Sequence, residues 1–124
     1  MAKLLIADDL VPIRQMVRIT LSTQGWTILE APDGKTALAV ARAERPDLVL
    51  LDVDMGAGPN GFDVCRALKA ESETRNIPVV MLTAHGSDSD RAMGVAAGAA
   101  RHMTKPFGPV ELIDTIRSLL VRAG

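Results

Sequence analysis

Two short apolar runs in this chain end directly in aspartate. Residues 3–7 are followed by Asp8 and Asp9, and residues 48–51 are followed by Asp52. Uninterrupted apolar runs of this length are typical of strands that are buried on both faces, as in parallel sheets. Because parallel strands bring their carboxyl ends to one edge of the sheet, we expect the three carboxylates to meet there.

Carboxylates that gather in one place repel one another. A pair about 4 Å apart repels by about 4 kcal/mol at an effective dielectric constant of about 20. A bound cation offsets this repulsion, and a site made only of oxygen atoms suits Mg²⁺. The sequence therefore predicts a magnesium site built from Asp8, Asp9 and Asp52.

Strand-like and helix-like segments alternate along the rest of the chain. Three more strands are expected at residues 26–31, 77–83 and 100–104. Helices are expected between and after the strands, and they should begin near Pro12, Asp33, Gly61, Ser87 and Pro109. The helix near Gly61 should run to about Ser72. This alternation predicts an α/β fold with a five-stranded parallel sheet and helices on both faces.

Length and composition fit one ordinary domain. The 124 residues are 48% hydrophobic and 23% charged, which is a globular composition. We expect residues 1–124 to form a single domain with no separate output domain. The net charge of −1 offers no basic field for direct contact with nucleic acid.

The sequence carries no sign of membrane insertion or export. No apolar run reaches the roughly 18 residues that would span a membrane, and the first strand leaves no room for a signal peptide. Cys65 is the single cysteine, so no disulfide is expected. These features favour a cytoplasmic protein.

Two more polar side chains follow apolar strand segments. Thr83 comes directly after residues 79–82, and Lys105 follows the last expected strand. Each alone has an ordinary explanation, as a turn former or an exposed charge. Together with the three aspartates on one edge of the sheet, they indicate a functional site.

Five segments of the chain carry a known pattern: LLIADD, PDLVLLD, NGFDV, VVMLTA and GAARHMTKPF. In them the chain resembles the receiver domain of response regulators in two-component signalling, and the resemblance covers the whole chain. It implies a CheY-like, flavodoxin-like fold with strand order 2-1-3-4-5.

The resemblance also implies a chemistry. Asp52 would accept a phosphoryl group from a phosphohistidine of a histidine kinase or a histidine phosphotransfer protein. Asp8, Asp9, Asp52 and the backbone carbonyl of Asp54 would hold the Mg²⁺ that this transfer requires. Such a domain acts on its own aspartate and is not an enzyme with external substrates.

Three further residues take roles through the same resemblance. Lys105 would pair with a phosphoryl oxygen, and the Lys105–Pro106 peptide bond would be cis. Thr83 would move to hydrogen-bond another phosphoryl oxygen. This movement would change the face formed by the last two helices and the last strand, which binds a downstream protein of unknown identity. The domain itself would be a monomer or a weak dimer.

The chain departs from the family pattern at several positions. His102 stands where most members have Tyr or Phe, and it could act as the switch residue or have no signalling role. Asp54 is acidic, and it could be a simple exposed side chain or could influence the metal or a water. The loop after Asp52 is one residue longer than usual and has Gly56 in place of a proline.

Other functions fit the sequence less well. Residues 51–54 resemble the Asp-x-Asp motif of haloacid dehalogenase-type phosphatases, but that motif usually lies on the first strand and the chain is short for that fold. A flavodoxin-like FMN protein needs a phosphate-binding loop after the first strand, where this chain has Asp8 and Asp9. A receiver that only binds a partner would not need Asp9, Asp52, Thr83 and Lys105 together.

Overall fold

Strands and helices alternate along the chain, as the sequence pattern predicts. The computed structural model describes residues 2–56, 58–84 and 86–123, with side chains up to residue 120. The strands are β1 (Lys3–Ala7), β2 (Thr27–Ala31), β3 (Leu48–Asp52), β4 (Val79–Thr83) and β5 (Arg101–Thr104). The helices are α1 (Val11–Ser22), α2 (Gly34–Glu44), α3 (Gly61–Ala70), α4 (Asp88–Ala97) and α5 (Pro109–Ala123).

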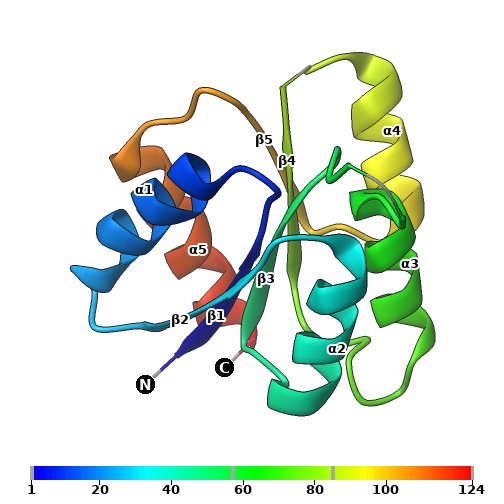
Figure 1. Cartoon of the computed structure of the whole chain (residues 1–124), viewed down its shortest axis with the longest axis horizontal. Helices are drawn as coiled ribbons and strands as arrows, with labels where there is room; N and C mark the ends of the chain where they lie inside the picture. The colour runs from blue at the N-terminus through cyan, green and yellow to red at the C-terminus, as the bar shows by residue number, and fades with distance from the viewer. Residues whose placement is uncertain (1, 57, 85, 124) are drawn as a thin grey trace.

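The strands form one parallel sheet in the order β2-β1-β3-β4-β5, which confirms the expected fold. Helices α1 and α5 cover one face of the sheet, and α2, α3 and α4 cover the other (Figure 1). The parallel pairing continues just past the strand ends. The amide of Val53 donates to the carbonyl of Leu82 at 2.9 Å, and the amide of Lys105 donates to the carbonyl of Thr83 at 2.7 Å. These bonds hold the loops after β3 and β5 at the carboxyl edge.

The central strands are buried on both faces, as their apolar runs predict. Side chains of β1, β3 and β4 alternate between two cores, one under α2–α4 and one under α1 and α5. All residues of β3 and β4 are buried, whereas in the edge strand β5 only Met103 is. The edge strand therefore keeps partly exposed side chains that face solvent.

Several predicted element bounds differ from the structure by one or two residues. β4 begins at Val79, not at Ile77, because Pro78 has no amide hydrogen and the amide of Ile77 bonds to the carbonyl of Thr74 at 3.0 Å. β2 and β5 each begin one residue after the start that the sequence predicts. α3 ends at Ala70, before the predicted Ser72. The Thr74 hydroxyl donates to the carbonyl of Leu68 at 2.7 Å and so satisfies one of the carbonyls at the end of this helix.

Three of the predicted helix starts carry side-chain caps, and the cap of α3 is Asn60, whose side chain accepts from the amide of Asp63 at 2.9 Å. The carboxylate of Asp33 accepts from the amide of Thr36 at 2.7 Å, and the hydroxyl of Ser87 accepts from the amide of Asp90 at 3.1 Å. In the part of the chain that the structure describes, no helix combines the length and apolar character needed to cross a membrane.

Candidate functional site

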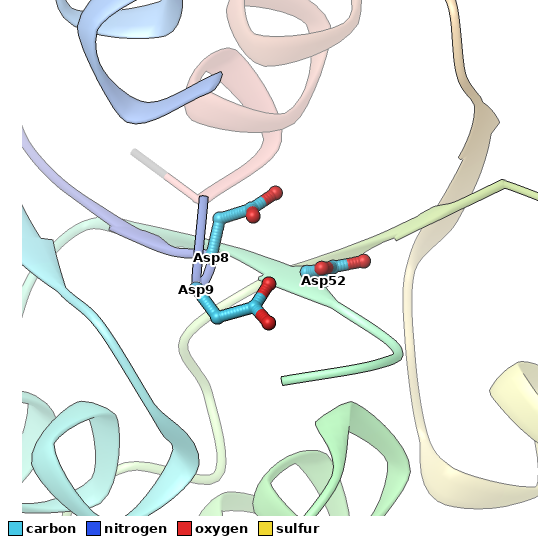
Figure 2. Close-up of side chains that lie close together, drawn as sticks. All are labelled: Asp8, Asp9 and Asp52. Atoms are coloured by element: carbon cyan, nitrogen blue, oxygen red, sulfur yellow. The ribbon is translucent and has the colours of Figure 1, made fainter. Parts of the chain in front are cut away.

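Three carboxylates meet at the carboxyl edge of the sheet. Asp8 and Asp9 follow β1, and Asp52 ends β3, its neighbour in the sheet. One oxygen from each carboxylate lies within 4.8 Å of the others, and Figure 2 shows the three side chains extending to the same side. Asp8 is fully buried, Asp52 is 6% exposed and Asp9 is exposed. The cluster is therefore accessible from solvent on the side of Asp9.

Asp8 is held by three groups. The amide of Leu10 donates to its carboxylate at 2.9 Å, and the Arg14 guanidinium donates to its backbone carbonyl at 2.6 Å. The ammonium of Lys105 donates to the other carboxylate oxygen at 2.9 Å. A buried carboxylate that accepts several such bonds is fixed in position, so Asp8 forms the rigid inner wall of the site.

Lys105 links two of the aspartates. Its ammonium also lies 3.2 Å from a carboxylate oxygen of Asp52. The Lys105–Pro106 peptide bond is cis. The site thus brings one ammonium group to two buried carboxylates.

The charges of the site change two pKa values. Burial is the main factor that raises the pKa of Asp52 to about 6, and the neighbouring charges of Asp8 and Asp9 act in the same direction. The ammonium of Lys105 opposes this shift only in part. Burial alone would lower the pKa of Lys105, but its bonds and charge interactions with Asp8 and Asp52 raise it. Without a bound metal ion, the three carboxylates outnumber the single ammonium of Lys105, so the site has an excess of negative charge at neutral pH.

The donor set of the cluster fits a divalent cation with oxygen ligands. Three carboxylates can contribute, and the excess negative charge disfavours leaving the site without a cation. Asp8, Asp9 and Asp52 are thus brought together as a candidate Mg²⁺ site.

Thr83 ends β4 at the same edge and is 2% exposed. Its hydroxyl donates to the carboxylate of Asp90 in the first turn of α4 at 3.4 Å. The sequence predicted a helix start near Ser87 but did not predict this contact. The short spacing between the end of the predicted strand and the start of the next helix could have indicated this contact, because such a helix places its first turn near the end of the strand.

The loop after Asp52 lies against the cluster. Asp54 is exposed, whereas Val53 and Met55 on either side of it are buried. Gly56 has a φ of +75°, and a Cβ atom there would lie 3.9 Å from the carboxylate of Asp9. Ala57, in the same loop, lies outside the described residues.

Gly61 fixes the start of α3 against the backbone of Asp52. A Cβ atom on Gly61 would lie 2.4 Å from the carbonyl oxygen of Asp52, which no real side chain tolerates. The Gly61 amide donates to the carbonyl of Val53 at 2.9 Å. Sequence reasoning used this glycine only as part of a motif and missed its packing role.

His102 is partly buried in β5, opposite Met81 of β4. Both ring nitrogens are buried and have no hydrogen-bond partner among the described residues. Burial and the nearby charge of Arg91 lower the pKa of His102, and the charge of Asp90 partly opposes them. The imidazole is therefore favoured in its neutral form.

A family model described as the response regulator receiver domain matches residues 4–117. The chain belongs to this receiver-domain family. Among curated relatives, the phosphate regulon transcriptional regulatory protein PhoB of Pseudomonas aeruginosa is 40% identical over 121 residues, which is 98% of this chain and 52% of that protein. PhoB of Escherichia coli is 42% identical over 120 residues, 97% of this chain and 52% of that protein.

A solved structure agrees with this family membership. The chemotaxis response regulator CheY4 of Vibrio cholerae is 38% identical and matches with a TM-score of 0.90 over 96% of this chain and 98% of that chain. The receiver fold thus accounts for the whole CheY4 chain, whereas this chain spans about half the length of the PhoB relatives it matches. The predicted family and CheY-like fold are confirmed, and the chain is a two-component signalling domain.

Proposed function

We propose that Asp52 accepts a phosphoryl group from a histidine kinase or a histidine phosphotransfer protein, in a Mg²⁺-dependent reaction. The observation that carries this proposal is the position of Asp52 at the end of β3, 6% exposed, beside two more carboxylates and the ammonium of Lys105. The modified domain then presents a changed α4–β5–α5 face to a downstream protein. We place this reaction in the cytoplasm and assign the chain no direct contact with nucleic acid.

Asp52 acts as the nucleophile. Its pKa of about 6 leaves it mostly ionised at neutral pH, so a carboxylate oxygen can attack phosphorus. A P–O bond forms to Asp52, the P–N bond of the phosphohistidine breaks, and the leaving imidazole takes a proton from solvent. The domain modifies only its own aspartate.

Asp8, Asp9 and Asp52, with the backbone carbonyl of Asp54, would hold the Mg²⁺. When bound, the ion offsets the repulsion of the carboxylates and neutralises charge on the phosphoryl oxygens. Asp8 contributes a preset position, because Leu10 and Lys105 already orient its carboxylate.

Lys105 and Thr83 respond to the phosphoryl group. The ammonium of Lys105, 3.2 Å from Asp52, can turn to a phosphoryl oxygen. Thr83 can exchange its hydrogen bond with Asp90 for one to another phosphoryl oxygen. This exchange releases the first turn of α4 from the end of β4, and His102 in β5 is the switch residue beside it. We expect the unmodified domain to be a monomer or a weak dimer.

The proposal is tested by labelling with a phosphoryl donor. The protein is incubated with Mg²⁺ and acetyl phosphate, and the intact mass is measured; beryllofluoride binding is followed by NMR. We expect modification of the wild type and of Asp114→Asn, an exposed aspartate of α5 that serves as control. Asp52→Asn should abolish it, and undiminished labelling of that variant contradicts the assignment. Steady turnover of p-nitrophenyl phosphate would instead favour a phosphatase.

A further inference from the structure

Arg14, near the start of α1, connects three parts of the structure. Its guanidinium donates through a terminal nitrogen to the backbone carbonyl of Asp8 at 2.6 Å, and through Nε to the carboxylate of Glu30 in β2 at 3.2 Å. The side chain of Arg14 is 14% exposed, so both bonds are largely shielded from water. One planar group thus ties α1 and the edge strand β2 to the turn that follows β1.

The turn that Arg14 contacts carries two of the three clustered carboxylates. Asp8 and Asp9 are consecutive residues of this β1–α1 turn, residues 8–10 (Figure 2). The amide of Asp8 also donates to the carbonyl of Ala31 in β2 at 3.1 Å. Asp9 is exposed, so its neighbours restrict its carboxylate little, and the backbone of the turn sets where it points.

A second arginine of α1 offers a comparison within the same network. Arg18 donates to the other carboxylate oxygen of Glu30 at 2.6 Å and to the carbonyl of Ile28 at 3.3 Å. It therefore shares the acid that Arg14 uses, but its bonds go to β2 alone and not to the β1–α1 turn. Its side chain is 47% exposed.

The charge of Arg14 does not favour a cation at the cluster. A guanidinium repels a nearby divalent cation, although the carboxylate of Glu30 and the solvent weaken this repulsion. The bond from Arg14 to the carbonyl of Asp8 acts differently, because it restrains the backbone that carries the carboxylates. The two effects have opposite signs for metal binding and can be separated by measurement.

We propose that Arg14, anchored by Glu30, is a positioning residue for the cation site. It fixes the β1–α1 turn, and with it the carboxylates of Asp8 and Asp9, in the arrangement that a small ion requires. Mg²⁺ demands near-ideal octahedral geometry, whereas Ca²⁺ accepts irregular geometry, so this restraint favours Mg²⁺ over the larger ion. The inference rests on the proposed function, because it concerns the Mg²⁺ that the proposed reaction uses.

The test is calorimetric titration of the full chain with Mg²⁺ and, separately, with Ca²⁺, in the absence of a phosphoryl donor. Arg14→Met keeps an unbranched side chain but removes every donor. It should bind Mg²⁺ about tenfold more weakly than the wild type, which is typical when a group that orients a metal ligand is lost. The affinity for Ca²⁺ should fall less. Loss of repulsion alone would instead strengthen the binding of both ions.

Two further variants separate positioning from charge and from general destabilisation. Arg18→Met is the matched control, because it removes an arginine and a bond to Glu30 but leaves the turn untouched, and it should bind Mg²⁺ like the wild type. Arg14→Lys keeps the charge but lacks the planar group that reaches Asp8 and Glu30 together, so it should also lose Mg²⁺ affinity. Urea unfolding in EDTA checks that each variant is folded. If Arg14→Met is not, Arg14→Lys carries the test.

The anchoring role of Glu30 is tested by a double-mutant cycle. Glu30→Ala should weaken Mg²⁺ binding, and adding it to Arg14→Met should cost little more than Arg14→Met alone, because both act through the same contact. Losses that add in full would show that Glu30 acts through its charge and not through Arg14.

Three other results would overturn the inference. They are an Arg14 variant that binds Mg²⁺ as tightly as the wild type or more tightly, equal losses for Mg²⁺ and Ca²⁺, or an equal loss in Arg18→Met. The wild type distinguishes the two proposals. If it binds no Mg²⁺, the metal site of the proposed function fails and the inference fails with it. If it binds Mg²⁺ and the Arg14 variants bind alike, only the positioning role fails.

Discussion

The hydroxyl of Thr83 donates a hydrogen bond to the carboxylate of Asp90 and so joins the end of β4 to the first turn of α4. This bond holds the hydroxyl toward α4, while the proposed phosphoryl group would draw it toward Asp52. The two positions compete. In the proposed switch, the contact with Asp90 therefore opposes the movement of Thr83 toward the phosphoryl group.

Asp90→Ala should favour the switched state. The variant removes the Asp90 carboxylate, which accepts a hydrogen bond from the Thr83 hydroxyl, but keeps the backbone amide that Ser87 caps. A hydrogen bond contributes about 0.5 to 1.5 kcal/mol net, so beryllofluoride should bind about twofold to tenfold more tightly. NMR titration with beryllofluoride measures this. Asp88→Ala, at an exposed acid of the same helical turn, should leave the affinity unchanged, and an equal gain in both variants would show an effect of charge alone.

Asp52→Asn should stabilise the metal-free protein at neutral pH. The pKa of Asp52 is about 6 in the folded state against an ordinary value of 3.8, so the folded protein binds that proton more tightly than the unfolded chain. The stability linked to this proton is present below the ordinary value and is lost as pH rises through the folded pKa. The gain from the variant should grow to about 1 to 3 kcal/mol between about pH 4 and pH 7. Urea unfolding in EDTA measures it, and a gain independent of pH would contradict the shift.

Asp9→Asn should lose most of its affinity for Mg²⁺. Asp9 is the exposed member of the carboxylate cluster, and its removal leaves fewer carboxylates for an ion. We expect affinity to fall about tenfold or more, as seen by calorimetry, while stability in EDTA is equal or higher because repulsion is relieved. Asp54→Asn keeps the backbone carbonyl and should bind Mg²⁺ much like the wild type. If Asp9→Asn also binds like the wild type, the metal site is elsewhere.

Lys105→Met should destabilise the metal-free domain. It removes the ammonium that donates to Asp8, whose carboxylate is fully buried. Leaving a buried charge without its partner costs several kcal/mol, and because the Lys105 side chain is 18% exposed we expect about 2 to 4 kcal/mol in EDTA. Mg²⁺ should restore part of the loss by supplying another cation. Urea unfolding with and without Mg²⁺ measures both effects, and a loss that Mg²⁺ does not change would point to packing.

His102→Tyr should remove the part of the pH dependence of stability that comes from the titration of His102. Burial and Arg91 lower the pKa of His102 below its ordinary 6.5, while Asp90 acts in the opposite direction. Stability from the neutral ring is present above the ordinary value and is lost as pH falls through the lowered pKa. The wild type should therefore lose stability relative to His102→Tyr between about pH 7 and pH 5. NMR shifts of α4 and β5 in the beryllofluoride form should follow the same trend, and identical profiles would make His102 a passive residue.

Much of the fold follows from local patterns in the sequence. The strands were identified because Leu48 to Leu51 and residues 79–82 are apolar without interruption, and the structure buries them on both faces. The errors were at the ends of elements: β4 starts after Pro78, which has no amide hydrogen to donate, and α3 ends at Ala70, before the predicted Ser72. Such ends depend on individual turns, which apolar patterns do not describe.

The sequence predicted which strand ends form the site, but not every contact between their side chains. Asp8, Asp9 and Asp52 meet because β1 and β3 are parallel neighbours. The bond between Lys105 and Asp8 could not be predicted in this way, since 97 residues separate them and β3 and β4 lie between their strands in the sheet. It depends on the reach of a long side chain across the sheet edge.

Because Gly61 lies close to the backbone of Asp52, the two ends of the loop that joins β3 to α3 are held next to each other. Its base is fixed by the bond from Gly61 to Val53, so residues inserted or lost at its tip change neither the position of Asp52 nor the start of α3. Variation in loop length is thereby confined to the solvent side. The surroundings of Asp52, the proposed phosphoacceptor, can therefore vary while Asp52 itself stays in place.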